Sequence, residues 1–228
     1  KMRYPKVTMP KKFSIDDSMI IRPVKKDKNA EVLRGPNIGI LPRSPELPDT
    51  IHGIVTIKVG DKITTDHIIP AGARMKYRSN IPKYSEFVFE NVDPTFAKRA
   101  MSIRQDGKQN IIVAGLSYGQ GSSREHAALC PMYLGVRAVI AKSFERIHTA
   151  NLINFGILPL TFCVESDYNH INQEDILEIT DTKKTLAGDG KFMMKNKTKG
   201  IAFYVTCTLS ERQKQILLAG GALNMTNE

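Results

Sequence analysis

The residues best suited to chemistry lie in one stretch, GLSYGQGSSREHAAL (residues 115–129). It places three glycines, the pair Ser122 and Ser123, and Arg124 between a short apolar run and a pattern typical of a helix. A glycine-rich turn from a strand into a helix can bind an anion, because unpaired N–H groups and the helix dipole point at the turn. Arg124 adds a fork of donors suited to a carboxylate. The stretch therefore predicts an anion site.

Other readings of this stretch differ in how much they explain. Nucleotide binding is disfavoured, because Arg124 stands where a dinucleotide fingerprint needs its third glycine and no P-loop Gly-Lys-Ser/Thr is present. The G-x-S-x-G elbow of a hydrolase is absent as well. A structural alternative stays open, since Ser122 and Glu125 have the spacing of a capping box. A cap alone leaves Ser123, two glycines and Arg124 unexplained.

A second cluster lies in ITTDHIIPAGARMKYRSN (residues 63–80), which we expect to be a loop interrupted by proline and glycine. It carries Asp66, His67 and Arg78. Local turn hydrogen bonds and an ordinary surface arginine explain these residues equally well when they are taken alone. The remaining histidines give no signal beyond ordinary polar positions: His52, His148 and His170.

The three cysteines, Cys130, Cys163 and Cys207, lie 33 and 44 residues apart. They form no CxxC pair, no zinc-type spacing with histidine and no even disulfide set. We expect free or buried thiols in a reducing compartment, and no metal bound by this chain.

Bulk composition is that of an ordinary globular protein, with 41% hydrophobic and 25% charged residues. No run reaches the roughly 18 apolar residues of a membrane span, and no signal peptide is evident. We expect a soluble, cytoplasmic protein. The net charge of +10 permits nucleic acid, a membrane surface or small polyanions as partners. Residues 1–50 hold 11 basic and 6 acidic residues, half of that net charge, so the charge does not require a nucleic-acid site.

The order of elements indicates an α/β domain behind an extended segment. Residues 1–50 hold seven of the twelve prolines and predict an extended arm or interdomain linker; a start without methionine suggests a fragment. The folded domain is expected over residues 51–228, with at least partly parallel strands. We expect strands at 52–59, 110–116, 136–142 and 157–162, helices at 94–101, 124–135 and 143–156, β-hairpin segments at 175–210, and a last helix with a capping box at Ser210 and Gln213.

Several stretches together resemble the C-terminal swivel domain of the aconitase superfamily. They are YGQGSSREHAAL, LGVRAVIAKSFERIHTANLINFGILPLTF, TTDHIIPAG, the linker GPNI…LPDT and LSERQKQILLAGGALN. The similarity covers roughly residues 35–222. It implies a three-layer swivelling β/β/α domain with a mixed, partly parallel sheet, preceded by the Pro-rich extended arm.

The resemblance also implies an activity. Members of the family are hydro-lyases. The aconitases of the tricarboxylic acid cycle interconvert citrate and isocitrate through cis-aconitate with a [4Fe–4S] cluster. The form of residues 118–125 and of Lys76–Arg78 looks like aconitate hydratase more than the isopropylmalate isomerase small subunits. The implied partners are a tricarboxylate substrate and upstream domains that bind the cluster, so this chain alone is expected to bind no cluster and to be inactive.

Carried over by position, the resemblance makes Ser122 the catalytic base. Ser123 and Arg124 match substrate-binding positions, Arg78 matches a substrate-carboxylate arginine, and Asp66 matches an orienting residue that acts through an arginine. Serine is a weak base that needs activation. Neighbouring positive charge in a dry site stabilises its alkoxide.

Three alternatives remain from the sequence. The chain could be a small-subunit type of homoaconitase or isopropylmalate isomerase, or an RNA-binding module of an aconitase-like regulatory protein. The latter has little support, because aromatic stacking platforms are not interleaved with the basic residues. The third is a non-catalytic α/β domain with a capped helix. We expect neither nucleic acid nor a membrane as partner.

Overall fold

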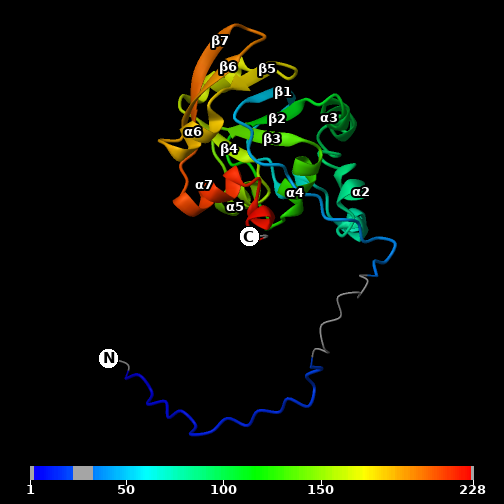
Figure 1. The fold of residues 1–228 in the computed structure, drawn as a ribbon, viewed down its shortest axis with the longest axis vertical. Helices are drawn as coiled ribbons and strands as arrows, with labels where there is room; N and C mark the ends of the chain where they lie inside the picture. Colours follow the sequence, from blue (N-terminus) through cyan, green and yellow to red (C-terminus); the bar gives the residue numbers. More distant parts are fainter. Residues whose placement is uncertain (1–2, 23–32, 227–228) are drawn as a thin grey trace. The chain divides into compact units, whose positions relative to one another are not determined.

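The computed structural model describes residues 3–22 and 33–226 (Figure 1). The chain divides into two units, residues 1–33 and 34–228. Residues 3–22 of the first unit contain no helix or strand, and a turn closes where the Ile20 N–H donates to the Asp17 carbonyl at 2.9 Å. All elements described below belong to the second unit.

Seven strands of the second unit pair in the order β1-β2-β3-β4-β7-β6-β5, and β5 pairs with β1 to close the sheet into a barrel. The pairs within β1–β4 are parallel and all other pairs are antiparallel. The expected mixed, partly parallel sheet is therefore confirmed. The strands are β1 (Ile51–Lys58), β2 (Gln109–Ala114), β3 (Val136–Ala141), β4 (Leu158–Phe162), β5 (Ile176–Ile179), β6 (Lys191–Asn196) and β7 (Ile201–Thr206).

The helices are α1 (Thr65–Ile68), the 3₁₀ helix η1 (Gly72–Tyr77), α2 (Ile81–Ser85), α3 (Phe96–Gln105), α4 (His126–Tyr133), α5 (Arg146–Asn154), the 3₁₀ helix η2 (Glu165–His170), α6 (Thr182–Ala187), α7 (Glu211–Leu218) and α8 (Ala222–Met225). Helices α4 and α5 connect parallel strands, and α2–α5 pack on one face of the sheet, whereas α6 and α7 pack into the core shared with β5–β7. The capping box predicted for the last long helix is present at α7, where Ser210 and Gln213 bond reciprocally. Of the helices in the described residues, none is long and apolar enough to cross a membrane.

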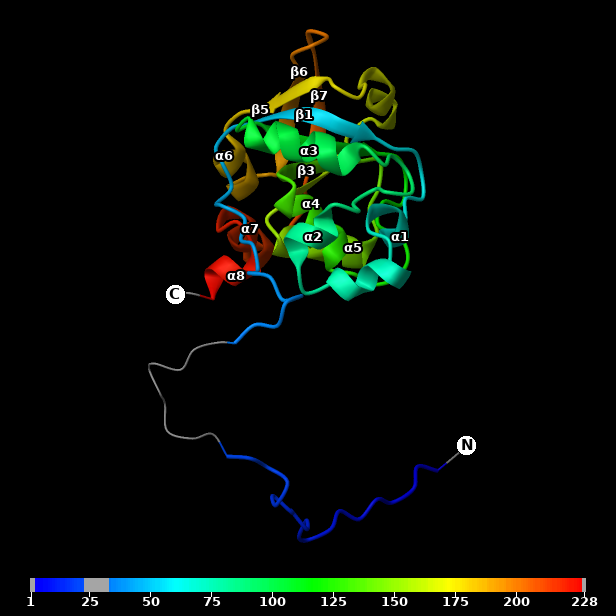
Figure 2. The ribbon, with the colours of Figure 1, turned by 90° about the vertical axis from the view of Figure 1, so that its right-hand side faces the viewer.

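Two hydrophobic cores lie on the two faces of the parallel strands. Alternation along β2 places Ile112 and Ala114 in the core shared with α2–α5, whereas Ile111 and Val113 face the core shared with β5–β7. Figures 1 and 2 show β5–β7 on one side of β1–β3 and helices α4 and α5 on the other. This is the β/β/α layering that the resemblance implies.

Some local predictions are wrong, in each case because a short helix forms. Residues 63–80, expected as a loop, contain α1 and η1; Thr64 caps α1 in a capping box with His67. Residues 182–187, expected within hairpin segments, form α6. Such four- to six-residue helices carry too little periodicity to be detected in a sequence.

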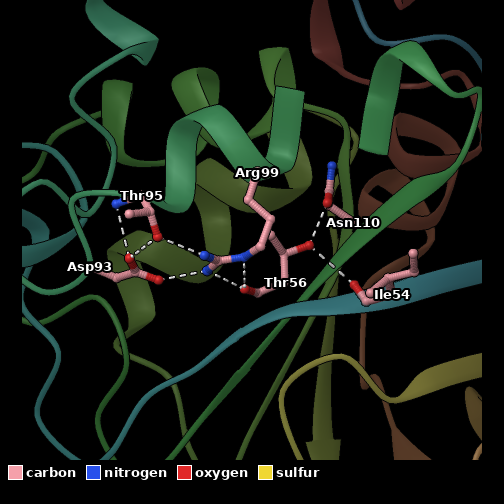
Figure 3. Close-up of polar contacts among 6 residues, drawn as sticks. All are labelled: Ile54, Thr56, Asp93, Thr95, Arg99 and Asn110. Carbon is pink, nitrogen blue, oxygen red and sulfur yellow. Dashed lines mark hydrogen bonds and ion pairs between the residues drawn. The ribbon is translucent and has the colours of Figure 1, made fainter. Parts of the chain in front are cut away.

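A polar network joins α3 to the parallel strands (Figure 3). The Arg99 guanidinium donates to the Thr56 carbonyl at 2.8 Å, to the Asp93 carboxylate at 2.6 Å and to the Thr95 hydroxyl at 2.8 Å. The Thr56 hydroxyl in turn donates to Asn110 of β2. The bond from Arg99 to the Thr56 carbonyl joins α3 to β1, while Asp93 and Thr95 orient the Arg99 guanidinium, so the network helps to fix how α3 lies on the sheet.

Candidate active site

Three loops meet at the carboxyl edge of the parallel strands. They follow β1, β2 and β3, and short bridges pair Thr64 with Gln120 and Tyr118 with Phe144. The Thr65 N–H donates to the Gln120 carbonyl at 2.8 Å. Ligands of open α/β sheets bind at this edge, because the loops that leave adjacent parallel strands converge there. The predicted site residues Asp66 and Ser122 lie on two of these loops.

The loops enclose a cavity of about 180 Å³. Its walls are formed by the turn after β2, by α1 and by the start of α5. The lining residues are Thr65, Gly119, Gly121, Ser122, Ser123, Arg124, Glu145, Arg146, Ile147, His148 and Asn151.

Arg124 and Asp66 form a bidentate ion pair across two loops. Nη1 and Nη2 of Arg124 lie 2.7 Å and 3.1 Å from the two carboxylate oxygens of Asp66, and Nη1 also donates to the Ile69 carbonyl at 3.3 Å. The hydrogen bonds from Arg124 hold the pKa of the Asp66 carboxyl below its usual range. Asp66 itself is placed by α1, whose first turn is fixed by the Thr64 and His67 capping box. The structure thus brings together four predicted residues: Asp66, Ser122, Ser123 and Arg124.

The turn that carries Ser122 requires its glycines. Gly119 and Gly121 have φ of +86° and +104°, a region that side chains rarely adopt. A Cβ at Gly119 would also lie 2.2 Å from the ring of His148. The Thr65 hydroxyl donates to the Ser122 carbonyl at 3.0 Å, which ties the turn to α1. The Ser122 side chain is left exposed beside the cavity.

The capping-box alternative for Ser122 and Glu125 is wrong. Helix α4 begins at His126, and its N-cap is Glu125, three residues after Ser122, without a side-chain cap hydrogen bond. The N–H groups of Ala127 and Ala128 already bond to the carbonyls of Arg124 and Glu125. Residues 121–124 lie outside the helix, and the Ser122 carbonyl is bonded to Thr65 of α1. The guanidinium-bearing residues Arg124 and Arg146 line the same cavity as Ser122.

Arg78 lies outside this cavity. Its carbonyl accepts a hydrogen bond from Nε2 of His126 at 2.9 Å, which fixes its backbone beside the start of α4. Its side chain is exposed, and its guanidinium forms no hydrogen bond or ion pair with the described residues.

His148 is a lining residue that sequence reasoning missed. The side chain is 1% exposed and packs edge-on against Tyr118, with ring centroids 5.2 Å apart. Within residues 3–22 and 33–226, neither ring nitrogen has a hydrogen-bond partner. Burial lowers the pKa of His148 to about 4, so the ring is neutral at pH 7. The available signal was its place just after β3, whose carboxyl end lies at the same edge as that of β2.

The cysteines do not fit an iron–sulfur cluster. Cys130 and Cys207 are buried in different cores, and Cys163 is exposed on the surface. Burial raises the pKa of both Cys130 and Cys207 to about 12, whereas a metal ligand is a thiolate. The described residues contain no cluster of three or more His, Cys, Asp or Glu that could hold a metal.

Comparison with known proteins identifies the family. The model of the aconitase C-terminal domain matches residues 61–165. A solved structure of 3-isopropylmalate dehydratase (leuD) from Methanocaldococcus jannaschii is 31% identical, with a TM-score of 0.63 over 78% of this chain and 93% of that one. The chain belongs to the aconitase C-terminal domain family. The similarity confirms the family and fold that the resemblance implies.

Curated relatives of this aconitase C-terminal domain are much longer proteins. A probable mitochondrial aconitate hydratase of Caenorhabditis elegans is 37% identical over 76% of this chain, and a mitochondrial homocitrate dehydratase of Saccharomyces cerevisiae is 33% identical over 88%. The chain spans 25% and 29% of their lengths. The expected cytoplasmic location is wrong on this comparison, because these relatives are named as mitochondrial. Composition could not separate the two compartments.

Proposed function

We propose that this aconitase C-terminal domain contributes the substrate-binding arginines and the serine base of an aconitate hydratase. That enzyme is a hydro-lyase interconverting citrate and isocitrate through cis-aconitate. The observation that carries the proposal is the bidentate pair of Arg124 and Asp66 beside Ser122 and Ser123 in one cavity. The similarity to a named aconitate hydratase supports the reaction class.

Arg124 is prepared to bind a carboxylate. Its five N–H groups lie in one plane. The two terminal nitrogens use three of them, on Asp66 and on the Ile69 carbonyl. The remaining two, on Nε and Nη2, form the side-on fork of the guanidinium. This fork matches the two oxygens of a substrate carboxylate. Asp66 thus orients Arg124 without occupying the face that binds substrate.

Ser122 is the group we propose to abstract the carbon-bound proton. No described side chain is hydrogen-bonded to its hydroxyl, so no neighbouring base activates it. Its alkoxide form is instead stabilised by positive charge from Arg124 and from Arg146, which also lines the cavity. The same charges stabilise the negative charge that develops on the substrate as the proton leaves.

Ser123 and Arg78 are proposed to complete substrate binding. Ser123 lines the cavity next to Arg124. Arg78 reaches substrate from outside the cavity, on a backbone anchored to His126. Two arginines on separate loops can hold a polycarboxylate at both ends. An isomerase of this type needs such contacts, because its intermediate must bind again in a second orientation.

The cofactor and remaining catalytic groups are proposed to come from other polypeptide. The cysteines of this chain do not fit the [4Fe–4S] cluster that the family implies. We propose a mitochondrial location, as in the names of the relatives. Homocitrate is the second substrate to test, because the yeast relative matches 88% of this chain.

Complementation tests the proposal. The purified chain is added to the cluster-loaded remainder of a related aconitate hydratase lacking its own C-terminal domain, and citrate, homocitrate and isopropylmalate are assayed in parallel. We expect hydro-lyase activity with citrate that depends on both components. Arg124→Lys should raise KM at least about tenfold, because an ammonium group has no planar fork. Arg212→Lys, at an exposed position of α7, is the matched control. Activity of the chain alone, or equal activity without it, would contradict the proposal.

A further inference from the structure

A second cavity, of about 240 Å³, lies at the amino edge of the parallel strands. It is bounded by the turn before β2, by the first residues of β3 and by residues 42–45. It shares no lining residue with the cavity that holds Ser122. Its lining residues are Pro42, Arg43, Pro45, Arg104, Gly107, Lys108, Gln109, Met132, Tyr133, Gly135 and Arg137. We call it the Arg137 cavity.

The wall of the Arg137 cavity carries four cationic side chains and no carboxylate. Arg104, Lys108 and Arg137 form no ion pair with an acidic group anywhere in residues 3–22 and 33–226. The nearest acid in sequence, Asp106, belongs to the same turn but does not line the cavity. Arg104, Lys108 and Arg137 therefore place like charges in one concave site, where they repel one another and favour an anion.

Arg137 has no acidic group as a partner within the described residues. Its side chain is partly buried, and in the same part of the chain its one hydrogen-bond partner is the Ser44 hydroxyl. Burial, and next the charge of Arg104, lower the pKa of Arg137. Buried charges in proteins are normally paired with an opposite charge or bound to an ion. A neutral hydroxyl supplies neither.

The cavity is built from parts that are held in place without any ligand. Asn224 donates to the Ser44 carbonyl at 2.8 Å, and the Ser44 hydroxyl donates to Pro45. On the other wall, Asn110 donates to the Leu134 carbonyl at 2.8 Å. The Arg104 guanidinium lies over the Tyr133 ring, 4.7 Å from its centroid, and donates to the Tyr133 carbonyl. A preformed site loses little entropy when it binds a ligand.

We propose that the Arg137 cavity binds a phosphate group of a small polyanion. Arg104, Lys108 and Arg137 line the same cavity, and two guanidinium groups with one ammonium match a tetrahedral group carrying two or more negative charges. The volume accommodates a phosphate or a diphosphate. This site lies at the opposite edge of the strands from the proposed carboxylate site and shares no lining residue with it. A negative result at one site therefore does not contradict the proposal for the other.

Calorimetric titration of the purified chain with pyrophosphate at low salt tests the proposal. Inorganic phosphate and citrate are titrated in parallel. We expect pyrophosphate to bind with one site per chain and more tightly than inorganic phosphate. Arg137→Gln and Lys108→Gln should each weaken that binding at least about tenfold. Lys108 is exposed, so its substitution tests the site even if Arg137→Gln disturbs folding.

Arg212→Gln is the matched control, because it removes the same charge from an exposed position of α7. Its pyrophosphate affinity should equal that of the unmodified chain. The proposal is overturned if the unmodified chain does not bind pyrophosphate, if Lys108→Gln and Arg137→Gln bind it unchanged, or if Arg212→Gln weakens it equally. Tighter binding of citrate that Lys108→Gln abolishes would overturn the assignment to phosphate.

Discussion

Ser122 combines an exposed hydroxyl with a fixed backbone, as a residue proposed to move a proton needs. In the complemented enzyme we expect Ser122→Ala to lower kcat at least about 10³-fold with little change in KM, because it removes a group used only in the transition state. Ser79→Ala, at an exposed site outside the cavity, is the control. Steady-state kinetics with citrate measure both constants. A loss below tenfold would remove Ser122 as the base.

His148 should make the stability of the domain depend on pH. Its pKa is about 4 in the folded chain and near 6.5 when unfolded, so the unfolded chain binds more protons between these values. The free energy of unfolding is therefore greatest above pH 6.5 and falls by up to about 3 kcal/mol as pH drops to 4. Urea unfolding at several pH values measures this slope.

Replacing His148 identifies its share of that slope. His148→Gln should reduce the loss of stability between pH 7 and pH 4.5, although it lowers stability at neutral pH. His170→Gln, which removes an imidazole from a side chain that is 60% exposed, is the control. Equal slopes for the unmodified chain and His148→Gln would show that the ring is not held neutral by burial.

At the scale of elements, the turn between β2 and α4 depends on its contact with α5. Gly119→Ala imposes a side chain at φ +86° and drives its Cβ into the His148 ring. We expect a loss of at least about 3 kcal/mol in the free energy of unfolding. Gly107→Ala is a matched control, since Gly107 has φ of +74° but nothing within 4 Å of its Cβ position. It should cost only about 1 kcal/mol.

The network in Figure 3 should set how firmly α3 lies on the sheet. Arg99→Ala removes charge-assisted hydrogen bonds to Thr56 and Asp93 and should cost about 2 kcal/mol in urea unfolding. Lys98→Ala, the exposed neighbour on the same helix, should change stability by less than about 0.5 kcal/mol. Similar losses for both variants would mean that the network contributes little.

For the molecule as a whole, residues 34–50 pack against the folded domain even though they lack helices and strands. Leu47 is 2% exposed in the core beside α7, and the Asp49 carbonyl accepts a hydrogen bond from the N–H of Thr182 at 2.8 Å. A chain starting at residue 51 should be less stable than one starting at residue 34 by about 2–4 kcal/mol. Urea unfolding of the two truncated chains measures the difference. Equal unfolding midpoints for the two chains would show that residues 34–50 do not stabilise the folded domain.

The domain boundary at residue 51 and the proposed roles of the site residues stay predictions. The strands were predictable because apolar and β-branched runs such as NIIVAGL define them locally. Helices α1 and α6 were not, since their stability comes from caps and tertiary packing. Likewise, the motif around Ser122 was visible, whereas the capping box at Ser122 and Glu125 does not form because α4 begins only at His126.

The sequence by itself determined the order of elements, the serine and arginine of the candidate site, and the family. Those features follow from local periodicity and from contiguous motifs. Only the tertiary structure decided that Arg124 pairs with Asp66, 58 residues away, that His148 closes the cavity, and that Arg104 and Arg137 share a second one. The physical reason is that the order of the strands in the sheet brings residues from distant parts of the sequence together. Which loops share an edge of the sheet depends on how β1–β4 pair, and that pairing is the summed result of burying two cores at once.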